Sequence, residues 1–215
     1  MACKHKFYGI EEYNGLIPNW KCKTLIIGTF NPENKFHSRN DANFFYQRRK
    51  NYFWDILPLL SNEKSIEKKD SNKQIEYLKK YKIGLTDLLL SINDADNNCL
   101  IHKDLISTVK DEDIEKFKEF SWNTDFILEF IKKSKIQAVF FTKLGNPNKK
   151  KIKQDTFENQ MRLIEDFCIS NNVFTKRLHS PTGMGLGAGN RIETLLDRWI
   201  NENGASKKWF DNTIL

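Results

Sequence analysis

Residues 25–32 read Leu-Ile-Ile-Gly-Thr-Phe-Asn-Pro, and this stretch decides the fold class. A short apolar run that ends abruptly in glycine and Asn-Pro is typical of a buried strand that delivers a polar loop to the end of a sheet. Further on, residues 44–54 read Phe-Phe-Tyr-Gln-Arg-Arg-Lys-Asn-Tyr-Phe-Trp. Aromatic rings stack on bases and cations bind phosphates, so the two stretches together favour a nucleic-acid base held at a strand end.

Outward from residues 25–32, apolar runs predict four strands, at 24–29, 82–86, 137–142 and 172–178. Apolar side chains spaced three and four apart predict helices between and after them, over 51–61, 122–134, 155–170 and 190–201. Strands that alternate with helices of this length predict an α/β fold. We expect a three-layer α/β/α sandwich with a central, mostly parallel four-stranded sheet.

The remaining segments fit around one domain. At 215 residues the chain can bury a substantial core, and we expect a single domain over 1–215. Residues 61–82 are rich in Lys, Glu, Ser and Asn and predict a solvated, partly helical excursion, while 145–153 predict a basic loop. In the helix predicted over 122–134, the apolar face includes Phe126.

The net charge of +7 favours a polyanionic partner, although a solvated Lys-rich surface accounts for it equally well.

Composition also bounds the setting of the protein. We find no apolar signal segment and no run of the ~18 apolar residues that a membrane span needs. The four cysteines are far apart, which favours free thiols in a reducing compartment. We therefore expect a soluble, cytoplasmic protein, a monomer with no membrane contact. No His, Cys or carboxylate cluster has metal-ligand spacing, so we expect neither a metal nor a cofactor.

Polar residues follow the predicted strands at the edge where a parallel sheet binds its ligands. Asn31, Asp87 and Thr142 each stand at such a strand end. After the last strand, residues 179–189 read His-Ser-Pro-Thr-Gly-Met-Gly-Leu-Gly-Ala-Gly before a predicted helix. Alternating glycines allow a backbone to approach a ligand closely, but the spacing is neither a dinucleotide fingerprint nor a P-loop.

These motifs resemble the uracil-DNA glycosylase superfamily, particularly its mismatch-specific and hypoxanthine-specific branches. Gly28-Thr29-Phe30-Asn31-Pro32 is similar to the Gly-Ile-Asn-Pro strand end, with Phe30 as an extra residue. Tyr46 and then Asn51-Tyr52-Phe53-Trp54 are similar to the aromatic and the Asn-x-Phe-Trp helix start, with Lys50 where the family has Arg or Ala. Gly84-Leu85-Thr86-Asp87 and His179-Ser180-Pro181 resemble the later motifs, although the family reads His-Pro-Ser. The order holds over residues 24–199.

The resemblance implies a monofunctional DNA glycosylase that hydrolyses the N-glycosidic bond of a deaminated base, uracil or hypoxanthine, flipped out of DNA. It implies DNA with a damaged or mismatched base as the partner. Asn51, Asn31 and His179 are then the candidate catalytic residues, for positioning water and donating to a base oxygen. The candidate base-binding residues are Tyr46, Phe45, Phe30 and Asp87. The candidate DNA-binding residues are Arg48, Arg49, Lys50, Ser180, Thr182, Gly183, Met184 and Leu186.

Each role has a structural alternative. Asn51 matches the family spacing to Tyr46 without a gap, so we assign the water to Asn51 and a second pocket contact to Asn31. Asn51 could instead cap the helix that follows, Asn31 could be a turn residue, and Asp87 could be a buried structural partner. Two other functions remain open: a non-catalytic nucleic-acid-binding member of the same fold, and a small-molecule nucleoside- or nucleotide-binding α/β enzyme.

Overall fold

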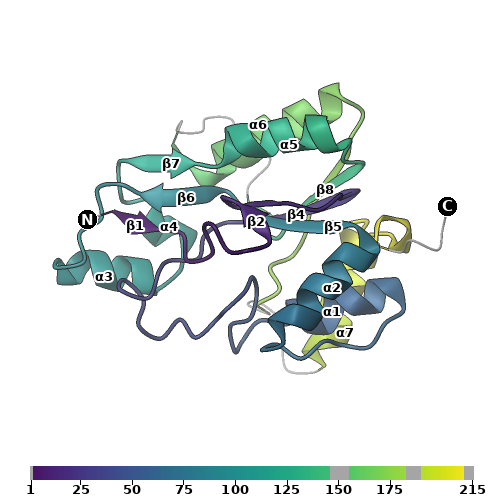
Figure 1. Ribbon diagram of the computed structural model, residues 1–215, viewed down its shortest axis with the longest axis horizontal. Helices are drawn as coiled ribbons and strands as arrows, with labels where there is room; N and C mark the ends of the chain where they lie inside the picture. Colours follow the sequence, from purple (N-terminus) through teal and green to yellow (C-terminus); the bar gives the residue numbers. More distant parts are fainter. Residues whose placement is uncertain (1, 146–154, 183–189, 211–215) are drawn as a thin grey trace.

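A four-stranded parallel sheet forms the centre of the protein in the computed structural model, which describes residues 2–145, 155–182 and 190–210 (Figure 1). Its order is β5-β4-β8-β9, and every neighbouring pair is parallel. The four strands are β4(Thr24–Gly28), β5(Ile83–Asp87), β8(Ala138–Phe141) and β9(Phe174–Arg177). All four predicted strands are therefore confirmed, with ends that shift by one or two residues.

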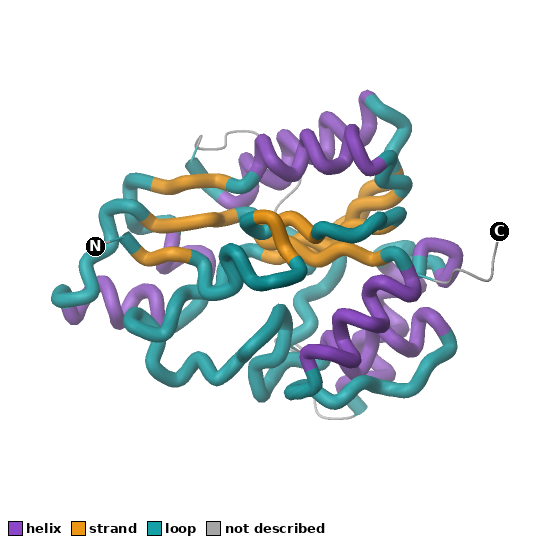
Figure 2. The backbone as a smooth tube through the Cα atoms, viewed as in Figure 1, coloured by secondary structure: helices purple, strands orange, loops and turns teal. Residues whose placement is uncertain are grey.

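Helices cover both faces of this sheet (Figures 1 and 2). One face carries α5(Thr124–Ser134) and α6(Phe157–Ser170). The other carries α1(Phe53–Ile56), the 3-10 helix η1(Leu57–Ser61), α2(Ser71–Tyr81) and α7(Arg191–Asp197), which continues into the π-helical turn η2(Arg198–Glu202). This arrangement is consistent with the predicted three-layer sandwich. Among the described residues, no helix has the length and apolar character to cross a membrane.

The central sheet is buried on both faces. Every residue of β4 is buried, and alternate side chains enter different cores: Ile26 packs among the residues around α1 and α2, whereas Leu25 and Ile27 pack among those around α5 and α6. Phe140 and Phe141 of β8 divide in the same way. A strand that is apolar on both faces reads as a continuous apolar run, which is why the sequence predicts it clearly.

A second, antiparallel sheet extends the molecule beside the central one. Its order is β1-β6-β7, from β1(Cys3–Lys4), β6(Leu89–Ile92) and β7(Phe120–Trp122). A small hairpin joins β2(Tyr13–Asn14) to β3(Ile17–Pro18), and short helices lie at α3(Leu100–Ser107), α4(Asp111–Ile114) and η3(Lys207–Trp209). The sequence does not predict these elements, and β1, β2 and β3, of two residues each, are too short to carry a detectable periodicity.

Two expectations about helices need correction. The segment 61–82 is not a peripheral excursion, because α2 buries Tyr77, Leu78 and Tyr81 against the core. Phe126 of α5 does not face the core and is 57% exposed, while Ile127 and Ile131 of the same helix are buried. Most of the predicted basic loop, residues 146–154, lies outside the described residues.

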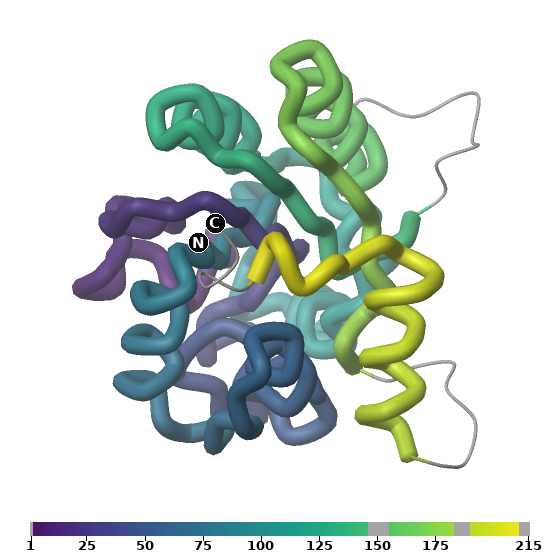
Figure 3. Tube along the Cα trace, turned by 90° about the vertical axis from the view of Figure 1, so that its right-hand side faces the viewer, coloured from purple at the N-terminus to yellow at the C-terminus, as the bar shows by residue number. Residues whose placement is uncertain are grey.

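The C-terminal segment closes the end of the sheet at which the strands begin. Thr24, the first residue of β4, donates its hydroxyl to the carbonyl of Trp209 at 2.5 Å, and Ser61 donates to the carbonyl of Phe210 at 2.7 Å. The Phe210 side chain is fully buried. Figure 3 shows this segment crossing that end of the sheet. The opposite end, where the strands finish, is left for the polar loops.

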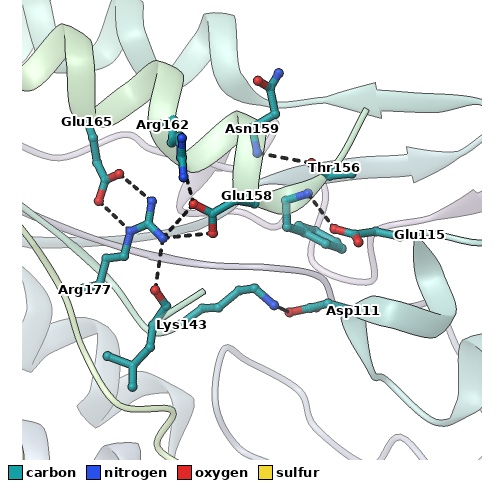
Figure 4. A network of polar contacts seen from close by, with 11 residues as sticks. Asp111, Glu115, Lys143, Thr156, Glu158, Asn159, Arg162, Glu165 and Arg177 are labelled. Atoms are coloured by element: carbon teal, nitrogen blue, oxygen red, sulfur yellow. Dashed lines mark hydrogen bonds and ion pairs between the residues drawn. The ribbon is translucent and has the colours of Figure 1, made fainter. Parts of the chain in front are cut away.

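An ion-pair network fastens the edge strand β9 to α6 (Figure 4). Arg177 donates Nε and Nη2 to the two carboxylate oxygens of Glu165, at 2.7 and 2.6 Å, and Nη1 to Glu158 at 2.9 Å. Its Nη1 also donates to the carbonyl of Leu144 at 3.0 Å. The Arg177 side chain is only 8% exposed, and its pKa is raised because the hydrogen bonds and charges of the two glutamates outweigh its burial.

Replacing Arg177 with methionine should lower the free energy of unfolding by ~3 kcal/mol, because two half-buried carboxylates would lose their shared cation. The measurement is denaturant unfolding followed by circular dichroism. Lys133→Met is the matched control, since Lys133 pairs with Glu129 on the exposed side of α5 and is 72% exposed. The control should leave the midpoint nearly unchanged. Equal midpoints for the two variants would contradict a structural role for the network.

Candidate functional site

A cleft of about 530 Å³ lies at the carboxyl ends of the central strands. Each of the four strands contributes to its wall, either through its last residue or through the loop that follows. The lining residues are 28–31, Tyr46, Arg48, Asn51, Asp87, 109–112, 142–144 and 179–182. A parallel sheet brings all its carboxyl ends to one edge, so residues that are far apart in the sequence meet here.

The Asp87 carboxylate is the most restrained group in the cleft. It is 2% exposed, and its Oδ2 accepts hydrogen bonds from His5 Nε2 at 2.8 Å and from Asn31 Nδ2 at 3.0 Å. The backbone N–H of Phe7 donates to His5 Nδ1 at 3.1 Å, so the proton of the neutral ring lies on Nε2 and points at Asp87. No described residue donates to Oδ1 of Asp87. One carboxylate oxygen is thus held in place while the other stays available.

Gly28 makes room for this carboxylate. A Cβ atom at Gly28 would lie 2.2 Å from Oδ1 of Asp87 and 2.8 Å from the hydroxyl oxygen of Tyr46. Both distances are too short for any side chain, so only glycine allows the carboxylate and the phenol to lie against the end of β4. This close approach explains why the Gly-Thr-Phe-Asn-Pro stretch begins with glycine.

Tyr46 lies in a backbone conformation that is uncommon for a non-glycine residue. Its φ is +60°, its ring stacks on Phe53 with centroids 3.9 Å apart, and its hydroxyl hydrogen-bonds Thr142 Oγ1 at 3.1 Å. Burial, followed by the charge of Asp87, raises the pKa of Tyr46 well above its usual value. The loop is held from behind, because Trp54 Nε1 donates to the Phe45 carbonyl at 2.8 Å. Such a local strain is often found at functional sites.

Arg48 contributes a cation to the cleft, and one edge of its guanidinium group has no hydrogen-bond partner among the described residues. Its Nε and Nη2 are buried and have no hydrogen-bond partner among the described residues. Burial lowers the pKa of Arg48 to about 10, although the charges of Asp87 and Asp41 oppose this.

Asn51 lines the cleft and lies two residues before helix α1. Its Oδ1 accepts from the backbone N–H of Phe53 at 2.9 Å, and the residue is 7% exposed. The amide oxygen therefore satisfies an N–H at the beginning of a helix, which is the structural alternative considered for this residue. Asn31, by contrast, uses its amide nitrogen on Asp87.

His179 lines the cleft at the end of β9, but its ring is engaged elsewhere. Its Nε2 pairs with Glu202 Oε2 at 2.9 Å, and its backbone N–H donates to Asn203 Oδ1 at 3.1 Å. Ser180 and Thr182 line the same wall, and the carbonyl of Pro181 accepts from Tyr52 N–H at 2.8 Å. The remaining predicted loop contacts, Gly183, Met184 and Leu186, lie outside the described residues.

Three predicted site residues do not reach the cleft. Phe45 is fully buried and packs against the rings of Phe7 and Tyr13, so it is a core residue in this structure rather than a stacking surface. Arg49 and Lys50 are exposed but do not line the cleft. Phe30, 5% exposed, does line it and meets the ring of His5 edge to face.

The sequence analysis missed two parts of the site. His5 is 82 residues away from Asp87 along the chain and belongs to a segment that no periodicity marks. The second part is the wall of residues 109–112, where Asp111 pairs with Lys143 at 2.5 Å (Figure 4). Lys143 follows a predicted strand end and could have been included, whereas nothing in the sequence links Asp111 to it.

The sequence matches no protein-family model and no curated protein, so the function has to be inferred from the cleft. Among the described residues, no three His, Cys, Asp or Glu side chains come together in a way that could hold a metal ion.

Replacing Gly28 with alanine should displace Asp87 and Tyr46 while leaving the sheet intact, because the new methyl group collides with their side chains. We expect the Nε2 proton of His5, hydrogen-bonded to a carboxylate in the wild type, to lose its distinct resonance in proton NMR. Gly84→Ala is the control, since its Cβ would meet Cys22 and Pro18 at 3.0 Å and would not touch the site. An unchanged His5 signal in Gly28→Ala would show that this close approach does not hold the carboxylate.

Proposed function

We propose that the protein is a monofunctional DNA glycosylase that hydrolyses the N-glycosidic bond of a deaminated base, uracil or hypoxanthine, flipped into the cleft. The observation that carries the proposal is the fixed Asp87 carboxylate, which lies beside Asn31 and Tyr46 where the central strands end. Amide, hydroxyl and aromatic groups around one buried carboxylate suit a neutral, planar, hydrogen-bonding ligand such as a base.

The proposed chemistry uses the free oxygen of Asp87. Cleavage of a glycosidic bond develops positive charge on the sugar, and a nearby carboxylate stabilises that charge and accepts a proton from the attacking water. Oδ2 is held by His5 and Asn31, so Oδ1 is the oxygen that acts. Asn31 donates to Asp87 with its nitrogen, which leaves its amide oxygen to orient the same water. This assigns the water to Asn31 and Asp87 rather than to Asn51, whose oxygen accepts from Phe53.

The departing base carries the complementary negative charge. In this proposal Tyr46 contacts the base, with its own ring supported by Phe53. The hydroxyls of Tyr46 and Thr142 line the cleft but hydrogen-bond each other, so Tyr46 donates to the base only by giving up its bond to Thr142, and His179 does so only if it leaves Glu202. The net charge of +7 favours association with a polyanion.

The test is single-turnover excision on oligonucleotides that contain uracil, hypoxanthine, xanthine or a thymine mismatch, in single and double strands. The proposal expects an abasic product from at least one deaminated base. Binding to the oligonucleotides without an abasic product would favour the non-catalytic nucleic-acid-binding alternative. Hydrolysis of free nucleosides alone would favour the small-molecule enzyme.

Asp87→Asn should lower the single-turnover excision rate by ~100-fold or more while changing oligonucleotide affinity little, because the amide keeps the side-chain shape and loses the charge. Asn31→Ala should also lower the rate more than the affinity.

Asn51 provides the matched comparison. Asn51→Ala should mainly lower the melting temperature, and Asn51→Asp should restore it, since both Asn and Asp accept at a helix start. If Asn51→Ala abolishes excision in a fully folded protein while Asp87→Asn excises normally, the roles assigned here are reversed.

A further inference from the structure

The side edge of the Arg48 guanidinium is the least satisfied polar group of the cleft. Nε and Nη2 lie on the same edge of the planar group and form the fork that grips two oxygens of one anion. Both atoms are buried without a partner among the described residues. Buried nitrogens of a cation that lack a counter-charge cost stability, so their presence in a residue of the cleft wall indicates a ligand that supplies the charge.

We infer that Arg48 forms a subsite for one phosphate group of the nucleotide whose base enters the cleft. The inference rests on the proposed function for the nucleotide, but the phosphate preference follows from the unpartnered fork itself.

Two further basic residues, Lys6 and His37, do not line the cleft but lie within reach of the charge of Arg48. Lys6 donates Nζ to the carbonyl of Asn40 at 2.8 Å, and the backbone N–H of Asn40 donates to the carbonyl of His37, which joins Lys6 to the segment that carries His37. Burial and then the charge of Arg48 lower the pKa of Lys6 and that of His37. Groups that repel one another in this way gain from an anion placed between them.

Nearby carboxylates do not neutralise the fork. Asp87 accepts from His5 and Asn31 through Oδ2. Asp41 pairs with Lys69 at 2.8 Å and has a side chain that is 62% exposed. Neither carboxylate hydrogen-bonds to Arg48. Arg49, the next residue in the sequence, is also a cation, but it is exposed and does not line the cleft.

The experiment couples a protein variant to a change in the DNA. Arg48→Met keeps the length of the side chain and removes the fork, and a methylphosphonate replaces one phosphodiester at a time with a neutral group on either side of the target nucleotide. Each change alone should weaken binding by about tenfold, the scale of one charge-assisted hydrogen-bonded pair. At the contacted position, the two changes together should cost no more than one of them.

Salt dependence and stability give independent readouts. Arg48→Met should reduce the slope of log affinity against log salt by about 1, as expected for one lost phosphate contact. Lys132→Met, on the exposed last turn of α5, removes the same charge away from the cleft and should leave the coupling unchanged. Inorganic phosphate should raise the melting temperature of the wild type and not of Arg48→Met, and without phosphate the variant should melt no lower than the wild type.

A comparison of deoxyuridine and deoxyinosine with their 5′-monophosphates identifies the source of the phosphate. A monophosphate preference that Arg48→Met abolishes, with no methylphosphonate coupling, assigns the subsite to a free nucleotide. The phosphate subsite is overturned if the affinity losses from Arg48→Met and from the methylphosphonate are additive at every DNA position and the nucleoside and its monophosphate bind equally. If Arg48→Met and a methylphosphonate are coupled but no base is excised, the phosphate subsite is supported and the glycosylase function is overturned. If a base is excised but the losses are additive at every position, the glycosylase function is supported and the phosphate subsite is overturned.

Discussion

The hydrogen bond between His5 and the buried carboxylate of Asp87 is the interaction on which the site depends. It joins the N-terminal segment to the last residue of β5. That segment is itself placed between two others: the backbone N–H of His5 donates to Leu90, and that of Lys6 donates to Asn31. A carboxylate buried this deeply needs compensating donors, and His5 and Asn31 provide them. The site is therefore complete only when the N-terminal segment is packed in this position.

The parallel sheet determines which end of the molecule can hold such a site. All four strands start at one edge, where the C-terminal segment packs across them through Thr24 and Phe210. They finish at the other edge, where the polar loops that follow the strands lie beside one another. The antiparallel sheet lies next to this second edge, because β6 follows β5 directly and pairs with β1, the strand that precedes His5. Asp87 therefore belongs to one sheet as the last residue of β5, and its carboxylate accepts from His5, which follows β1 of the other sheet.

The sequence predicts the central layer well and the periphery poorly, for physical reasons. Strands such as β4 are apolar on both faces, and the helices that cover them repeat every three to four residues, so each has a strong local signal. By contrast, β1 and β7 are edge strands of two and three residues that exist only because β6 pairs with both of them. The parallel arrangement explains why Asn31, Asp87 and His179 could be expected at one edge. Contacts between distant segments, such as those of His5 with Asp87 and Asp111 with Lys143, leave no trace in local spacing.

Several features of the cleft disfavour folding when considered alone. Tyr46 has a left-handed backbone, Arg48 keeps two buried nitrogens unpaired, and Asp87 is a charged group in an almost fully buried position. Elsewhere in the described core, apolar rings pack against one another and Gln47 satisfies two backbone N–H groups and two side chains. Departures from local rules that collect at one place, and are supported by a well-packed scaffold, are what selection for binding or catalysis leaves behind. Among the described residues, the unpaired buried nitrogens of a charged side chain, those of Arg48, and the buried carboxylate of Asp87 both lie here, and this distinguishes the cleft more than the total charge does.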